Sequence, residues 1–187
     1  MAVAERLMTA EEFLRLPKPR TGERLELVRG EVISMSPPGA VHGDKASSLA
    51  SALRAFVEQH RLGKVLVETG FCLECRPDTV RAPDVSFLSA ERLPAEGLPE
   101  GFVPGAPDLA IEIVSPGDLD WEIQQKVSEY LASGARRVWV VRPRSRSLTV
   151  HYPDGLARTL ARTDRLTSDH AAFNVAGFNL LLQDLLA

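Results

Sequence analysis

One short run, residues 109–116, constrains the fold most, because a single carboxylate, Glu112, stands there among apolar and β-branched neighbours. The run ends at Pro116, so it predicts a buried strand rather than a helix. An ionised carboxylate in such surroundings costs several kcal/mol unless an ion pair, hydrogen bonds or a metal ion stabilises it. The fold must therefore supply a partner for Glu112, and a buried structural ion pair is the simplest one.

A second strand-like run, residues 80–88, carries another carboxylate, Asp84, directly after Pro83. Asp84 could cap a turn or a sheet edge, or it could join Glu112 in a functional site. Because the two carboxylates lie on separate strands with a lysine, Lys126, further along the chain, the pattern indicates a divalent-metal site.

Lys126 lies on the predicted helix that follows Pro116, at the edge of its apolar stripe and next to Tyr130. The chain has four lysines against eighteen arginines, so a lysine here favours a role for a compact ammonium group. The alternative is an ion pair along the helix with Glu122 or Glu129.

Two carboxylates and a backbone carbonyl such as that of Ile113 are hard oxygen ligands of the kind that Mg²⁺ (or Mn²⁺) prefers. Such an ion, when bound, would polarise a phosphodiester and lower the pKa of a bound water. Lys126 would orient that water or stabilise developing charge. The sequence contains no Gly-rich phosphate loop, G-x-S-x-G or H-E-x-x-H.

The remaining periodicity predicts an α/β (α+β) fold with a mixed central sheet and helices on its faces. A capping box at residues 9–12 predicts a short helix, and Asp118 or Asp120 is expected to cap the Lys126 helix. A Pro- and Gly-rich segment, residues 89–107, is expected to frame the site or a subunit contact. The other predicted elements are a hairpin over 24–35, a helix over 42–61, strands over 65–74, 137–141 and 147–152, and an apolar tail over 174–186.

The length of 187 residues suits a single domain, residues 1–187. The first six residues lack a basic-then-apolar signal pattern, and no apolar run approaches the roughly 18–20 residues of a membrane span. We therefore expect a cytoplasmic protein without membrane contact. Cys72 and Cys75 have the spacing of half a zinc site, but without a second pair we interpret them as two semi-buried thiols.

The net charge of −3 gives no overall attraction to nucleic acid, so binding would require a local basic patch. Arginines around the strand over 137–141 are the candidates, and a solvated basic face is the alternative. These candidates are Arg136, Arg137, Arg142, Arg144 and Arg146.

Several of these motifs together resemble the Uma-type family of restriction-endonuclease-like proteins, within the PD-(D/E)XK nuclease-like superfamily. The resemblance is carried by Pro83-Asp84, by residues 112–116, and by Lys126 three residues before Glu129-Tyr130. It extends over nearly the whole chain, through residues 25–31, His42, residues 132–135 and 138–141, and residues 175–178.

The resemblance implies a restriction-endonuclease-like core with an N-terminal hairpin extension, Mg²⁺-dependent cleavage of DNA, and a homodimer. Asp84 and Glu112 would be metal ligands. The superfamily's usual lysine two residues after the glutamate is absent, since Val114 stands there, and Lys126 would replace it.

Glu26 and His42 match family positions near the site, which completes a candidate catalytic set with Asp84, Glu112 and Lys126. Each has a simpler interpretation. Glu26 could form a cross-strand ion pair with an arginine on the solvent face, and His42 could cap its helix or contact solvent.

Three functions compete. The first is a metal-dependent DNA endonuclease. The second, motivated by Val114 and the negative net charge, is a non-catalytic relative that binds nucleic acid or dimerises. The third is a sugar hydrolase with paired carboxylates, which ranks last because such sites usually add aromatic platforms and aromatic content is only 6%.

Overall fold

A computed structural model of the chain describes residues 6–17, 19 and 22–186. The first five residues, on which the expected lack of a signal pattern partly rests, lie outside the described part. Within the described part, no helix is long and apolar enough to cross a membrane.

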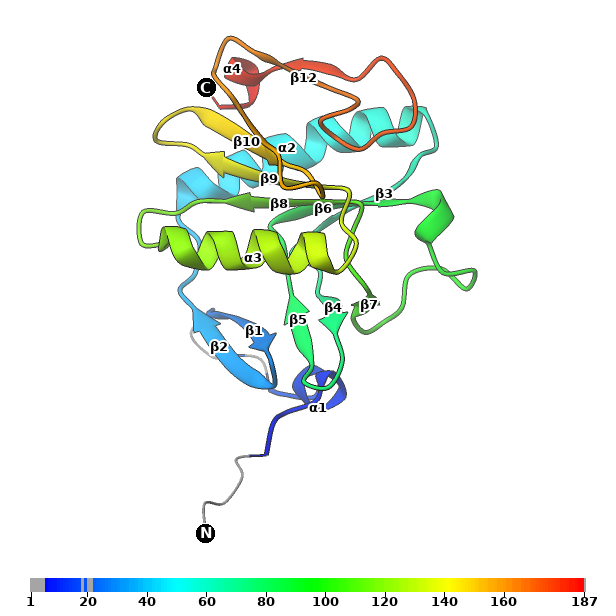
Figure 1. The fold of residues 1–187 in the computed structure, drawn as a ribbon, viewed down its shortest axis with the longest axis vertical. Helices are drawn as coiled ribbons and strands as arrows, with labels where there is room; N and C mark the ends of the chain where they lie inside the picture. Colours follow the sequence, from blue (N-terminus) through cyan, green and yellow to red (C-terminus); the bar gives the residue numbers. More distant parts are fainter. Residues whose placement is uncertain (1–5, 18, 20–21, 187) are drawn as a thin grey trace.

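A six-stranded mixed sheet forms the centre of the fold, with helices α2 (Ala40–Gln59) and α3 (Asp120–Ala132) on opposite faces (Figure 1). The neighbouring strands β8 and β9 are parallel, whereas the other pairs are antiparallel. The predicted mixed sheet is therefore confirmed. Its order is β11 (Ala157–Leu160), β10 (Ser147–His151), β9 (Arg137–Arg142), β8 (Leu109–Ile113), β6 (Val85–Ser89) and β3 (Gly63–Val67).

Strand β8 is buried along its whole length, as its sequence predicts. Side chains alternate between the faces of a strand, so Leu109, Ile111 and Ile113 pack on the side of α2. Ala110 belongs to the cluster on the side of α3, and Glu112 shares that face. The alternation therefore points the Glu112 carboxylate at the helix that carries Lys126.

The predicted N-terminal hairpin is confirmed and belongs to a second, five-stranded sheet. Arg29 and Gly30 have φ angles of 51° and 82°, the left-handed conformation that a two-residue hairpin turn requires. Pairing of Leu27 with Val80 joins the hairpin to the rest of the sheet. The order is β2 (Glu31–Met35), β1 (Arg24–Val28), β5 (Thr79–Arg81), β4 (Phe71–Glu74) and β7 (Val103–Pro104).

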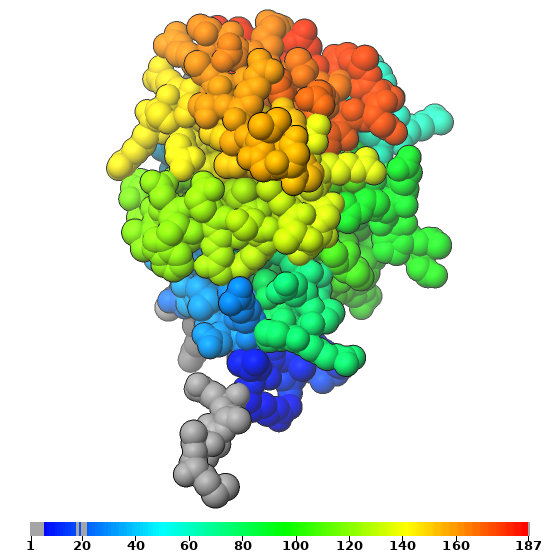
Figure 2. Space-filling view, in the orientation of Figure 1, coloured from blue at the N-terminus to red at the C-terminus, as the bar shows by residue number. Residues whose placement is uncertain are grey.

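Two predicted strands are each divided in two. The run over 65–74 breaks between β3 and β4, where Glu68 adopts a φ of 48°. The run over 80–88 breaks between β5 and β6 because Pro83 has no N–H to donate to a strand ladder. At each break the chain passes from one sheet to the other, so Asp84 lies at the junction of the sheets. In the space-filling view α3 lies directly above the hairpin (Figure 2).

The predicted N-terminal cap is confirmed for helix α1 but is wrong for helix α3. Helix α1 (Ala10–Leu14) begins at Thr9 with the expected capping box. The N-cap of α3 is Leu119, which has no capping side chain, and Asp118 instead accepts a hydrogen bond of 2.7 Å from the Ser115 N–H. Asp118 therefore closes the turn that leads into α3 and does not cap it.

The Pro- and Gly-rich segment, residues 89–107, does not line the cavity beside Glu112, so the expectation that it frames the site is wrong. It contains η1 (Ala90–Arg92) and β7, and the Phe102 ring stacks on Phe13 of α1 with 5.6 Å between ring centroids. Its role in a subunit contact stays a prediction. The C-terminal tail, residues 174–186, forms β13 (Asn179–Leu181), which pairs with the preceding β12 (Arg165–Thr167), and α4 (Leu182–Leu185). Its apolar residues pack in the cluster on the α2 side, as predicted.

Candidate functional site

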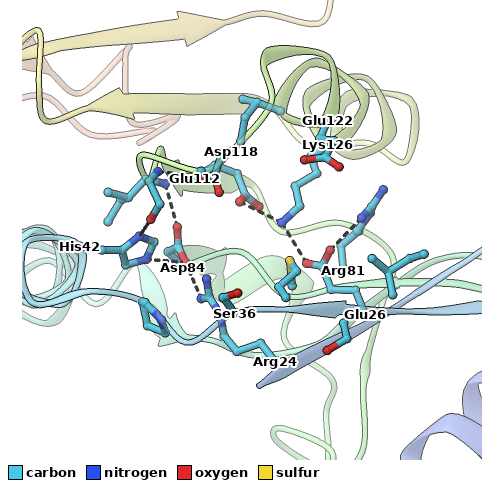
Figure 3. A pocket seen from close by; sticks show the side chains of 18 of the residues that line it. Arg24, Glu26, Ser36, His42, Arg81, Asp84, Glu112, Asp118, Glu122 and Lys126 are labelled. Atoms are coloured by element: carbon cyan, nitrogen blue, oxygen red, sulfur yellow. Dashed lines mark hydrogen bonds and ion pairs between the residues drawn. The ribbon is translucent and has the colours of Figure 1, made fainter. Parts of the chain in front are cut away.

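A cavity of about 550 Å³ lies between α3 and the β1–β2 hairpin, and both sheets contribute to its lining (Figure 3). Acidic side chains outnumber basic ones among the charged residues that line it. The acids are Glu26, Asp84, Glu112, Asp118 and Glu122, and the bases are Arg24, Arg81 and Lys126. When all five carboxylates are ionised, they exceed the three fixed cations by two negative charges, apart from His42.

Asp84 is held by three groups from different elements. Arg24 of β1 donates to Oδ1 at 2.7 Å, and the Ile113 N–H donates to Oδ2 at 2.7 Å. Nε2 of His42, from the first turn of α2, lies 2.9 Å from Oδ1, while Nδ1 lies 3.0 Å from the Ser115 hydroxyl. Burial alone would raise the pKa of Asp84, but His42, Arg24 and the Ile113 N–H together lower it. Asp84 is therefore ionised at neutral pH.

Strands β6 and β8 are antiparallel, and Val85 pairs with Ile111. Asp84 precedes Val85 and Glu112 follows Ile111, so these two residues lie opposite each other. The Tyr130 hydroxyl donates to Oε1 at 2.8 Å, and Lys126 Nζ donates to Oε2 at 3.1 Å. These two donors come from successive turns of α3.

Lys126 also connects Glu112 to Glu26 of the other sheet, because Nζ lies 3.1 Å from Glu26 Oε1. Arg81 donates to Glu26 Oε2 at 2.7 Å and to Glu129 at 2.6 Å. The alternative of an ion pair along the helix with Glu122 or Glu129 is therefore not the one that forms, because Lys126 pairs with Glu112 and Glu26 while Glu129 pairs with Arg81. Glu26 does pair with an arginine, but in the buried interior rather than on a solvent face.

The pKa values of the two glutamates move in opposite directions. Burial raises the pKa of Glu112 to about 7, the nearby Asp84 and Glu26 charges add to this, and Lys126 only partly opposes it. Burial also acts on Glu26, but Lys126, Arg81 and the Ala82 N–H lower its pKa. One shared lysine therefore cannot stabilise both carboxylates fully, and Glu112 is the group whose charge is least compensated.

This imbalance predicts how the stability of the metal-free protein depends on pH. Because the folded-state pKa of Glu112 is raised, the native state holds a proton between about pH 4.5 and 7 that the unfolded state releases, and stability falls as pH rises through this range. Glu112→Gln should remove that loss, on the order of 3 kcal/mol. Urea unfolding in EDTA at pH 5 and pH 8 checks it.

Wild type must be compared with the variant because two histidines change the pH dependence of stability in the direction opposite to Glu112. Burial lowers the pKa of His151 and of His170, so their contribution makes the protein more stable as pH rises. The difference in unfolding free energy between the two proteins cancels this term. Parallel pH profiles for wild type and Glu112→Gln would contradict the expected destabilisation.

A divalent cation fits the chemistry of this cavity. Among the described residues no group of three His, Cys, Asp or Glu side chains is arranged as a ready metal site. The fit rests instead on two facing carboxylates, Asp84 and Glu112, and on an excess of negative charge that one divalent ion would balance. The Ile113 carbonyl stays a predicted ligand, and Cys72 and Cys75 are free thiols outside the cavity.

The predicted arginine cluster is divided between the two ends of β9. Arg136 pairs with Asp108, and Arg137 pairs with Asp169 and covers the Tyr152 ring, at the end remote from Glu112. At the other end Arg142 pairs with Asp120, and Arg144 is exposed in the following turn with Arg146. A single patch that includes all five arginines is therefore not formed, and DNA contact by Arg136, Arg137 or Arg144 stays a prediction.

The structure thus brings together the five predicted catalytic candidates, Glu26, His42, Asp84, Glu112 and Lys126, around one cavity (Figure 3). Sequence reasoning missed Arg24, Arg81 and Tyr130. Arg81 carried a signal, since it is a lone charge in a short buried strand. Tyr130 carried none, because its ring also fits the apolar stripe of α3.

Comparisons with known proteins show the family and the fold of the chain. A family model described as "Uma2: Putative restriction endonuclease" matches residues 10–178. No curated protein sequence matches the chain significantly.

The chain superposes on the crystal structure of a "putative nuclease belonging to DUF820" from Anabaena variabilis with a TM-score of 0.80. The match covers 96% of this chain and 97% of the Anabaena chain. The two sequences are 22% identical, so the match shows a shared fold. The expected nuclease-like fold is confirmed. Since the family model spans most of the sequence, the chain belongs to the Uma2 family of restriction-endonuclease-like proteins.

Proposed function

We propose that the protein is a Mg²⁺-dependent (or Mn²⁺-dependent) endonuclease that hydrolyses phosphodiester bonds of DNA in this cavity. One observation carries the proposal. Val114, at the superfamily's usual lysine position, packs with the apolar cluster under α3, while Lys126 places its ammonium 3.1 Å from Glu112. A lysine is thus still paired with the buried carboxylate, but it comes from helix α3 instead of from strand β8.

Each residue has a role in this proposal. Asp84 and Glu112, with the Ile113 carbonyl, would hold the metal ion, which would supply polarisation of the phosphodiester and a lowered pKa for water. Lys126 stabilises negative charge that develops on the phosphate. His42 orients Asp84, and Tyr130 orients Glu112.

The family supports a nucleic-acid substrate in general. The choice of DNA, a homodimeric state and a cytoplasmic location are parts of the proposal. Of Arg136, Arg137 and Arg144, only Arg144 follows the end of β9 that lies beside Glu112, and we assign it a contact with the phosphate backbone.

One observation favours the second candidate, a non-catalytic nucleic-acid-binding or dimerising relative. The carboxylate oxygens of Asp84 and Glu112 already have partners within the protein, namely Arg24, His42, the Ile113 N–H, Lys126 and Tyr130. A metal ion must compete with these partners, and metal titration therefore separates the two functions.

Asp84→Asn tests the proposal. The change removes a negative charge but keeps an oxygen that can accept from Arg24 or Ile113. We expect Mn²⁺ binding in calorimetry to weaken by more than about tenfold. Nicking of supercoiled plasmid should fall by at least about a hundredfold.

Asp154→Asn is the matched control, because Asp154 accepts a hydrogen bond from Leu156 in a surface turn that asparagine can also make. It should bind Mn²⁺ and nick plasmid as wild type does. Wild-type protein that binds no metal in calorimetry would contradict the proposed function and leave the non-catalytic alternative.

A further inference from the structure

The two tryptophans of the chain differ sharply in exposure. Trp139 lies in β9 and is fully buried, with its indole N–H donating to the His170 carbonyl at 2.6 Å. Trp121, in the first turn of α3, is 62% exposed and lines the cavity. A large aromatic ring exposed at the wall of a candidate active site calls for a ligand, because burying it would contribute substantially to binding.

Other apolar side chains line the same cavity from the hairpin side. Ile33 and Met35 belong to β2, and Pro37 and Pro38 follow it. Ile33 is itself 42% exposed, although it lies in a strand. The cavity therefore combines apolar surface from α3 and the hairpin with the nearly buried charged groups of the site.

We propose that Trp121 and the apolar residues of the hairpin bind an unpaired nucleobase next to the cleaved phosphodiester, so that the substrate is single-stranded or locally unpaired DNA. The inference rests on the proposed function and narrows its substrate class. A nucleotide has the matching composition, with an anionic phosphate that requires cations and a flat base that stacks on aromatic rings.

Burial of the chemical groups gives the reason for an unpaired strand. The side chains of Asp84 and Glu112 are only 4% and 6% exposed, so the reacting phosphodiester must enter the cavity to reach them. In a duplex the bases next to that phosphate remain stacked and paired. A nucleotide that is unpaired and unstacked can enter the cavity together with its base, and the base would then lie against Trp121.

Tryptophan fluorescence tests the proposal directly, because Trp139 is buried and quenching by DNA reports on Trp121. The probe is a single-stranded oligodeoxythymidine of twelve residues, compared with a duplex of the same length, in EDTA so that no cleavage occurs. We expect the single strand to quench the emission and to bind more tightly than the duplex. Trp121→Ala should weaken single-strand binding by about five- to a hundredfold, measured by fluorescence anisotropy of labelled DNA.

Two controls make the result specific. Trp121→Phe should keep most of the affinity, because a smaller aromatic ring still stacks. Leu119→Ala should bind as wild type does, since Leu119 is 51% exposed two residues away but does not line the cavity. Equal affinity of Trp121→Ala and wild type, or equal binding of duplex and single strand, would overturn the proposal.

The outcome is separable from that of the proposed function. Metal-dependent nicking that is unaffected by Trp121→Ala would leave the nuclease and overturn the base site. Quenching by the single strand in a protein that never nicks DNA would support the base site and contradict the nuclease. Trp121 that becomes inaccessible to acrylamide as protein concentration rises, without DNA, would show a second copy covering it and overturn the proposal.

Discussion

Glu112→Gln is expected to lower metal-dependent nicking of supercoiled plasmid by at least about 10³-fold, the largest catalytic effect of any substitution in this protein. The amide keeps the shape of the side chain and an oxygen for the Tyr130 hydroxyl, but it removes the charge that would hold the metal ion. Initial rates of nicked-circle formation with Mg²⁺ and with Mn²⁺, for wild type and variant purified in parallel, measure the effect.

Misfolding cannot explain such a loss, since the same substitution should stabilise the metal-free protein at pH 8, where the wild-type carboxylate is charged and poorly compensated. Glu58→Gln is the matched control, because Glu58 is exposed near the end of α2 and outside the cavity. Equal nicking by Glu112→Gln and wild type would attribute the activity to a contaminant and contradict the assignment of Glu112.

Lys126→Met is expected to have the largest effect on stability. It leaves Glu26 and Glu112 without the cation they share, and removal of one partner from a buried ion pair typically costs about 3–5 kcal/mol. For a chain of this size the melting temperature should fall by on the order of 10 °C at pH 8. At pH 5 the loss should be smaller, because Glu112 takes up a proton.

Added Mn²⁺ should restore part of the melting temperature of Lys126→Met, since a divalent ion would supply the missing positive charge. Nicking should remain low, because the ammonium next to the reacting phosphate is absent. Lys64→Met, on an exposed position of β3, is the control for loss of a lysine charge. An unchanged melting temperature in Lys126→Met would show that the two carboxylates do not depend on this lysine.

The local patterns of the chain predicted its main elements well. Apolar runs identified β8 and β9, helical spacing placed Lys126 on the inner edge of α3, and the Thr9–Glu12 capping box identified α1. The sequence indicated that the Glu112 carboxylate needs a partner, because burial of a charge is costly wherever the strand lies, and Lys126 and Tyr130 are its partners. Such arguments need only the immediate neighbours of a residue.

The connections across the cavity were beyond sequence reasoning, because they depend on how the two sheets pack. Nothing near Arg24 in the sequence relates it to Asp84, and nothing near Arg81 indicates that it joins Glu26 to Glu129. The strand break at Pro83 was also missed, although proline disfavours a strand interior, because the apolar pattern continues on both sides of it.

The bridge formed by Lys126 has a consequence for how the protein folds. Its contact with Glu26 joins residues separated by 100 positions in the chain, so it forms only after both sheets have assembled. A folding intermediate that contains only the six-stranded sheet holds Asp84 and Glu112 but lacks the cations from β1 and β5. Under the proposed function, such an intermediate has the residues assigned to the metal ion and the phosphate but lacks Arg24, which holds Asp84, and Glu26, which holds Lys126, so we expect it to cut DNA less efficiently than the folded protein.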